Sequence, residues 1–121
     1  MKGIKLFLIV FLLSISIGGC AVDRITRLQS DGIDLLVDMD IEGFKEDIRE
    51  AYRRAPDDPY VMNNMGVVYE IEGDMQRARE LYRKAADNAG DRRVAKSSRE
   101  TDVGRLLRDV ATDNYKRVEV K

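Results

Sequence analysis

The side chains that could carry chemistry are a short run of carboxylates, a pair of serines and a lone cysteine. Glu70, Glu72 and Asp74 lie close together, and paired carboxylates can act as general acid and base. Ser97 and Ser98 could act as nucleophiles only beside an activating base, and the chain contains no histidine. We therefore expect the carboxylates to lie at a solvated turn and the protein not to be an enzyme.

The amino-acid composition argues against several other classes of function. The 121 residues suffice for one small domain. With no histidine and a single cysteine, the chain lacks the commonest zinc ligands and cannot form an intrachain disulfide. A formal net charge of -1 argues against a general nucleic-acid binder, which normally has a basic face. We expect no metal, no cofactor and no nucleic-acid partner. The basic residues between 77 and 99 are expected to form a solvated face, with a contact to a phosphate or a lipid headgroup as the alternative.

The N-terminus has the layout of a secretory signal. Two lysines precede an apolar run over residues 6–17, which is shorter than the roughly 20 residues of a membrane-spanning helix. The run ends in Ile-Gly-Gly-Cys, with the only cysteine at Cys20. This ending resembles the lipobox of bacterial lipoproteins. The alternatives are an uncleaved membrane anchor and a cysteine that merely ends an ordinary secretory signal.

The lipobox resemblance implies an address. Cleavage before Cys20 would make residues 1–19 a signal peptide and leave Cys20 with a diacylglycerol and an amide-linked chain such as palmitate. Several acyl chains together give stable membrane anchoring, which one chain does not. Residues 20–24 would form the acylated cysteine and a short tether. Ala21 stands where an aspartate would imply the inner membrane, so the resemblance implies the outer membrane, facing the periplasm.

Residues 59–92 carry the strongest helical pattern. Two apolar faces with helical spacing flank Gly73; they are Met62, Met65, Gly66 and Tyr69 before it and Ala78, Tyr82 and Ala85 after it. The pattern predicts a helical hairpin with small residues, Gly66 and Ala78, where the two helices touch. These residues resemble a tetratricopeptide (TPR) repeat, whose period is about 34 residues. The resemblance implies a solenoid of such hairpins.

The preceding segment, 25–58, repeats this pattern about 34 residues earlier. Gly32, Asp40 and Ile48 occupy the positions of Gly66, Asp74 and Tyr82. We predict a divergent TPR-like repeat with a first helix from about 24 to 38 and a second helix that begins after Asp40 as its N-cap. Met39 departs from the pattern, because it replaces the glycine of the turn.

Residues 93–121 are expected to form a linker and a C-terminal capping helix. Residues 88–102 are rich in polar and small side chains, which is typical of a loop. An apolar stripe follows, comprising Val103, Leu106, Leu107, Val110 and Ala111 and running to about Val118. It predicts a helix that either covers the last hairpin or begins a third repeat at Val103-Gly104. The predicted fold is therefore all-α: a TPR-type solenoid of about two repeats plus a C-terminal capping helix, after a cleaved signal peptide.

The TPR resemblance also implies a binding site, because in this family the first helix of each hairpin lines a concave groove that binds a peptide or helix. The corresponding residues of the first hairpin are Thr26, Gln29, Ser30, Ile33 and Val37, and those of the second hairpin are Tyr60, Asn63, Asn64, Val67, Glu70 and Ile71. Asn64 stands at a position that clamps a terminal carboxylate in some family members, but the accompanying lysine is missing. The apolar members favour an apolar helix or strand as the occupant.

We therefore expect an envelope-anchored scaffolding or protein–protein interaction module. A pilotin-like assembly factor for a pilus or secretion system is an alternative within that class. A self-associating structural lipoprotein, in which the last helix or a second copy fills the groove, is another alternative. A hydrolase or an accessory cell-wall enzyme is disfavoured by the lack of a base.

Overall fold

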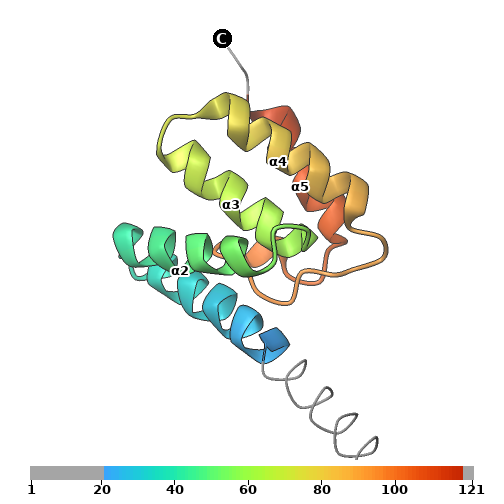
Figure 1. Ribbon diagram of the computed structural model, residues 1–121. Coiled ribbons are helices and arrows are strands. Elements are labelled where there is room, and N and C mark those ends of the chain that lie inside the picture. Colours follow the sequence, from blue (N-terminus) through green and yellow to red (C-terminus); the bar gives the residue numbers. More distant parts are fainter. Residues whose placement is uncertain (1–20, 119–121) are drawn as a thin grey trace, which may run out of the picture.

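The computed structural model describes residues 21–118, and these residues form helices joined by turns and loops (Figure 1). Residues 21–37 are helical and are called the N-terminal helix here. The elements that follow are α2 (Ile41–Arg54), α3 (Pro59–Ile71), α4 (Met75–Asn88), the short 3-10 helix η1 (Glu100–Asp102) and α5 (Leu107–Arg117). The expectation of an all-α chain is confirmed for this part of the sequence.

The helices form two hairpins and a last helix. The N-terminal helix lies beside α2, α3 lies beside α4, and α5 lies along α4 (Figure 1). Further contacts join α2 to α3, so the two hairpins stack into one body. The described helix already includes residues 21–24, which were expected to form a tether.

The turns of the two hairpins have the same construction. Asp40 and Asp74 are N-caps, and each side chain accepts a 3.0 Å hydrogen bond from a backbone amide in the first turn of its helix. Each aspartate amide also donates to a carbonyl of the preceding helix at 2.8 Å. Gly73 precedes one cap with a φ of 82°, and Met39 precedes the other with a φ of 65°. Met39 thus adopts the left-handed conformation that suits glycine.

In each hairpin the two helices approach most closely at an equivalent position. A Cβ atom on Gly66 would lie 2.6 Å from Cε1 of Tyr82, and one on Gly32 would lie 3.1 Å from Cδ1 of Ile48. These pairs are related by the period of about 34 residues that the sequence predicted. The helices of each hairpin therefore approach closely at these positions, and the approach is closest at Gly66.

The core lies between the two hairpins and extends to α5. Its fully or nearly fully buried members are Phe44, Ile48, Met62, Met65, Val68, Leu81, Ala85 and Ala111. Burying each large apolar side chain contributes about 1.5–3 kcal/mol. A smaller cluster comprises Ala89, Val94, Leu107 and Val110, and it joins the loop after α4 to α5. This second cluster holds the loop after α4 against α5, and residues of that loop line the cavity described below.

The segment before α5 differs from the expectation. Val103 is 49% exposed and Gly104 has a φ of 84°, so neither belongs to a helix. Backbone hydrogen bonds join Val94 to Arg105 and Gly104 at 2.9 and 2.7 Å and fold residues 92–106 back on themselves. The predicted start of a third repeat at Val103-Gly104 is therefore wrong. The helix begins at Leu107 and covers α4, as expected of a cap.

Candidate functional site

One cavity of about 950 Å³ lies between the N-terminal helix, α3, the loop before α5 and α5 itself. All but one of the groove residues that the sequence indicated line this cavity, namely Thr26, Gln29, Ser30, Ile33, Tyr60, Asn63, Asn64, Val67, Glu70 and Ile71. The exception is Val37, which is 59% exposed and lies outside the lining. The fold therefore brings together side chains from both hairpins. Cys20 lies outside the described residues, so its predicted lipidation has no structural description.

The floor of the cavity combines apolar side chains with a pair of amides. Ile33 from the N-terminal helix and Val67 and Ile71 from α3 provide apolar surface. Between them, the Nδ2 atom of Asn64 donates to Oε1 of Gln29 at 3.1 Å. This bond links the two hairpins. It leaves one amide nitrogen, of Gln29, and one amide oxygen, of Asn64, without a hydrogen bond to other described residues.

Residues 92–99, which we call the strap, cross from α4 to the N-terminal helix. The hydroxyl of Tyr60 donates to the carbonyl of Arg93, and burial raises the pKa of that phenol. The Nζ atom of Lys96 donates to Oγ of Ser30 at 3.0 Å and pairs with the carboxylate of Asp34 at 2.6 Å. The strap is thus fastened to both hairpins. Sequence reasoning placed it in a loop but did not detect these contacts.

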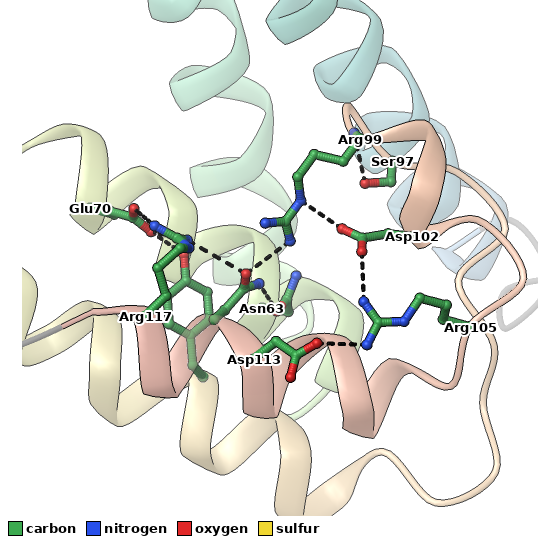
Figure 2. A network of polar contacts seen from close by, with 10 residues as sticks. Asn63, Glu70, Ser97, Arg99, Asp102, Arg105, Asp113 and Arg117 are labelled. Atoms are coloured by element: carbon green, nitrogen blue, oxygen red, sulfur yellow. Dashed lines mark hydrogen bonds and ion pairs between the residues drawn. The ribbon is translucent and has the colours of Figure 1, made fainter.

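A polar network closes the end of the cavity next to α5 (Figure 2). The carboxylate of Asp102 is almost fully buried and accepts hydrogen bonds from Arg99 at 2.7 Å and from Arg105 at 3.0 Å. Arg105 also pairs with Asp113 at 2.6 Å, which lowers the pKa of that carboxyl. A buried carboxylate is costly unless it is paired, so Asp102 holds Arg99 in place.

Two arginines meet at one asparagine. Oδ1 of Asn114 accepts from Arg99 at 2.9 Å and, at the limit of 3.5 Å, from Arg117. Nδ2 of Asn114 donates to Oδ1 of Asn63 at 3.1 Å. The Nδ2 group of Asn63 has no hydrogen-bond partner among residues 21–118, and Asn63 lines the cavity. Figure 2 shows Arg99 and Arg117 approaching this place from different sides.

The carboxylates at the end of α3 make ion pairs and hydrogen bonds that were not expected, although Glu72 is exposed to solvent as predicted. Glu70 accepts a hydrogen bond from the hydroxyl of Tyr82 at 2.8 Å and pairs with Arg117 through both carboxylate oxygens. The hydrogen bond from Arg117 lowers the pKa of Glu70, whereas burial raises the pKa of Tyr82. Glu72 pairs with Arg49 of α2. Because these partners lie far away in the sequence, the local pattern gave no sign of them.

Several residues of the site were missed by the sequence reasoning. They are Lys96, Arg99, Asn114 and Arg117. A signal existed for two of them, since Asn114 and Arg117 follow Val110 at helical spacing and so share the cavity-facing side of α5. The loop residues Lys96 and Arg99 have no such periodicity.

The described part of the chain shows no group of side chains that could hold a metal ion and no helix long and apolar enough to cross a membrane. Ser97 and Ser98 line the cavity, and Oγ of Ser97 accepts a hydrogen bond from the amide of Arg99 at 3.1 Å. No family model, curated protein or solved structure gives a significant match to this chain. The interpretation of the site therefore depends on its geometry and chemistry.

Proposed function

We propose that this protein is a lipoprotein of the bacterial envelope, built from TPR-type hairpins, that binds an extended segment of a partner protein in its cavity. The observation that supports this proposal most is that the residues chosen from the sequence as a groove, all except Val37, line one cavity of about 950 Å³. The shared turns and close contacts of the two hairpins support the TPR assignment. The proposed role is scaffolding, with no enzymatic activity.

The chemistry of the floor favours a peptide over a purely apolar occupant. The nitrogen of Gln29 and the oxygen of Asn64 offer one donor and one acceptor to the cavity. A peptide main chain carries the matching acceptor and donor at every residue. Side chains of the peptide can then lie against Ile33, Val67 and Ile71. Main-chain hydrogen bonds with adjoining apolar pockets are a recurring mode of peptide recognition.

The proposed anchor puts this cavity near the membrane surface. Val22 and Ile25 line the cavity and belong to the helix that follows Cys20 in sequence. With a helical rise of 1.5 Å per residue, they would lie within about 10 Å of a lipidated Cys20 along the helix axis. We therefore propose that the partner segment is presented close to the membrane, at the periplasmic face of the outer membrane.

The cavity also bears on the alternative of a self-sealed oligomer. Leu107, Val110 and Asn114 of α5 form one wall of the cavity, and the space beside them is open. A last helix that filled the groove would instead have left no such volume. This observation disfavours sealing by the chain's own last helix, whereas no contact distinguishes a partner protein from a second copy or selects a pilotin-like role among the scaffolding roles.

The test uses one cavity variant and a matched control outside the cavity. Ile71 is 41% exposed within the cavity lining, and Val103 is 49% exposed outside it. The tagged protein, expressed with its own N-terminus, is recovered from detergent-solubilised envelopes as wild type, Ile71→Asp and Val103→Asp. We expect one envelope protein to be recovered with wild type and Val103→Asp and lost with Ile71→Asp. Equal recovery with both variants, or recovery of its own copies alone, would contradict partner binding.

The anchor has its own test. Cys20→Ser removes the sulfur that the lipobox resemblance assigns to the lipid. We expect the wild type to incorporate labelled palmitate and to lose residues 1–19, whereas Cys20→Ser should incorporate no label and keep residues 1–19. A wild-type protein that incorporates no lipid and keeps residues 1–19 would show that the lipoprotein assignment is wrong and that the N-terminus is an uncleaved anchor.

A further inference from the structure

At the α5 end of the cavity, the arginine side chains are more exposed than the carboxylates with which they pair. The side chains of Arg99 and Arg117 are 48% and 49% exposed. Their partners are more buried, since the side chains of Asp102 and Glu70 are only 4% and 23% exposed. At the other end of the strap, Arg92 pairs with Asp58, and again the arginine side chain is more exposed than the aspartate side chain. A molecule in the cavity therefore meets guanidinium groups before it meets carboxylates.

We infer that this end of the cavity, between Arg99, Arg117 and Asn63, is a recognition site for the carboxylate of an Asp or Glu side chain in the bound peptide. This inference depends on the proposed peptide-binding function and names the chemistry of the partner. It assigns to Arg99 and Arg117, which lie outside the two hairpins, the role of reading an acidic residue. Val67 and Ile71 then contact the apolar neighbours of that residue.

Unused donors converge on this place. The Nη1 group of Arg99 makes no hydrogen bond to another described residue, because its Nε and Nη2 atoms hold Asp102 and Asn114. The Nδ2 group of Asn63 is likewise without a partner in residues 21–118, although the residue is only 8% exposed. Arg117 is held on Asn114 from the opposite side. A carboxylate has two oxygens that accept such donors, and charge-assisted bonds of this kind are the stronger ones.

Other anionic ligands fit less well. A phosphate group would carry up to two negative charges, whereas each arginine here is already paired with a carboxylate behind it. A fatty acyl chain on the floor would cover the amides of Gln29 and Asn64 without replacing the hydrogen bonds that they make to water. A peptide with an acidic side chain can hydrogen-bond to the amides of Gln29 and Asn64 through its main chain and pair with Arg99 and Arg117 through its carboxylate.

The test is a selection followed by paired binding measurements. The full chain in detergent micelles is immobilised and panned with a random heptapeptide library. The enriched peptides are synthesised together with versions in which Asp or Glu is replaced by Asn or Gln. Binding of each pair is measured by fluorescence anisotropy with wild type, Arg99→Gln, Asn114→Asp and Arg83→Gln. Arg83 is an exposed arginine of α4 outside the cavity lining and controls for net charge.

We expect wild type and Arg83→Gln to bind the acidic version at least about tenfold more tightly than the amide version. Arg99→Gln should lose this preference. Because that change also removes a partner of buried Asp102, Asn114→Asp provides a second, isosteric variant. It places a carboxylate where the two arginines meet and gives up the hydrogen bond from Asn114 to Asn63. It should remove the preference, and circular dichroism checks that the variant is folded.

The outcomes separate this inference from the proposed function. Peptides that bind without preferring an acid, or a preference that survives Asn114→Asp, would overturn the carboxylate site and leave peptide binding in place. A library that yields no binding peptide would overturn both.

Discussion

Replacing Gly66 by alanine tests the close approach of α3 and α4. The added methyl would lie 2.6 Å from Cε1 and 2.8 Å from Cδ1 of Tyr82. The tyrosine ring is fully buried, and its hydroxyl is held by Glu70 at 2.8 Å, so the ring cannot move without losing that bond. Overpacking of this kind costs about 1–3 kcal/mol. Alanine recovers about 1 kcal/mol of helix propensity.

We therefore expect Gly66→Ala to lower the free energy of unfolding by up to about 2 kcal/mol, a fall in Tm of up to roughly 10 °C. The matched control is Gly32→Ala. There the new methyl would lie 3.1 Å from the flexible end of Ile48, so the gain in helix propensity should leave stability equal or higher by up to about 1 kcal/mol. Chemical denaturation followed by circular dichroism measures both variants.

A double-mutant cycle separates the clash from other effects of the substitution. In a Tyr82→Leu background the ring is gone, so the cost of Gly66→Ala should shrink or change sign. A Gly66→Ala protein as stable as the Gly32→Ala protein, or an unchanged cost without the ring, would refute the contact as the reason for glycine at this position.

Three further predictions concern stability. Met39→Gly should raise the free energy of unfolding by about 0.5–1 kcal/mol in urea titration, because it relieves a left-handed φ of 65°; a loss of stability would contradict the strain. Asp74→Ala should cost about 1 kcal/mol in the same assay through loss of the N-cap, and an unchanged midpoint would count against the cap. The pKa of Glu70 is lowered from 4.5 by Arg117, so its stabilisation is fully present above pH 4.5 and is lost as the pH falls through the lowered value. Glu70→Gln should remove that part of the acid dependence of unfolding, and an identical pH profile would exclude it.

The sequence predicted those features that depend on local pattern. Helical periodicity and the recurrence after about 34 residues located both hairpins, their caps and their close contacts, because each of these has a fixed spacing along the chain. The groove residues followed from the same register, since they occupy one face of each first helix. The repeat therefore made the cavity predictable even though its two walls come from different hairpins.

The rest depends on contacts between residues distant in sequence. Glu70 and Arg117 are separated by 47 positions, and nothing in the local pattern selects this arginine among 21 basic residues. The start of the last helix was misplaced because Val103 matches the apolar stripe, although the loop hydrogen bonds of Val94 with Gly104 and Arg105 exclude Val103 from the helix. Pairing of this kind overrides a weak helical pattern.

The most direct test of partner binding in the cavity is photo-crosslinking in living cells. A photoreactive amino acid is introduced at Ile71 in the cavity lining, or at Val103 outside it as the control. The account predicts an adduct with one envelope protein from position 71 that is absent from position 103. Equal adducts at both positions, or adducts only between copies of this chain, would contradict the claim that the cavity receives a partner.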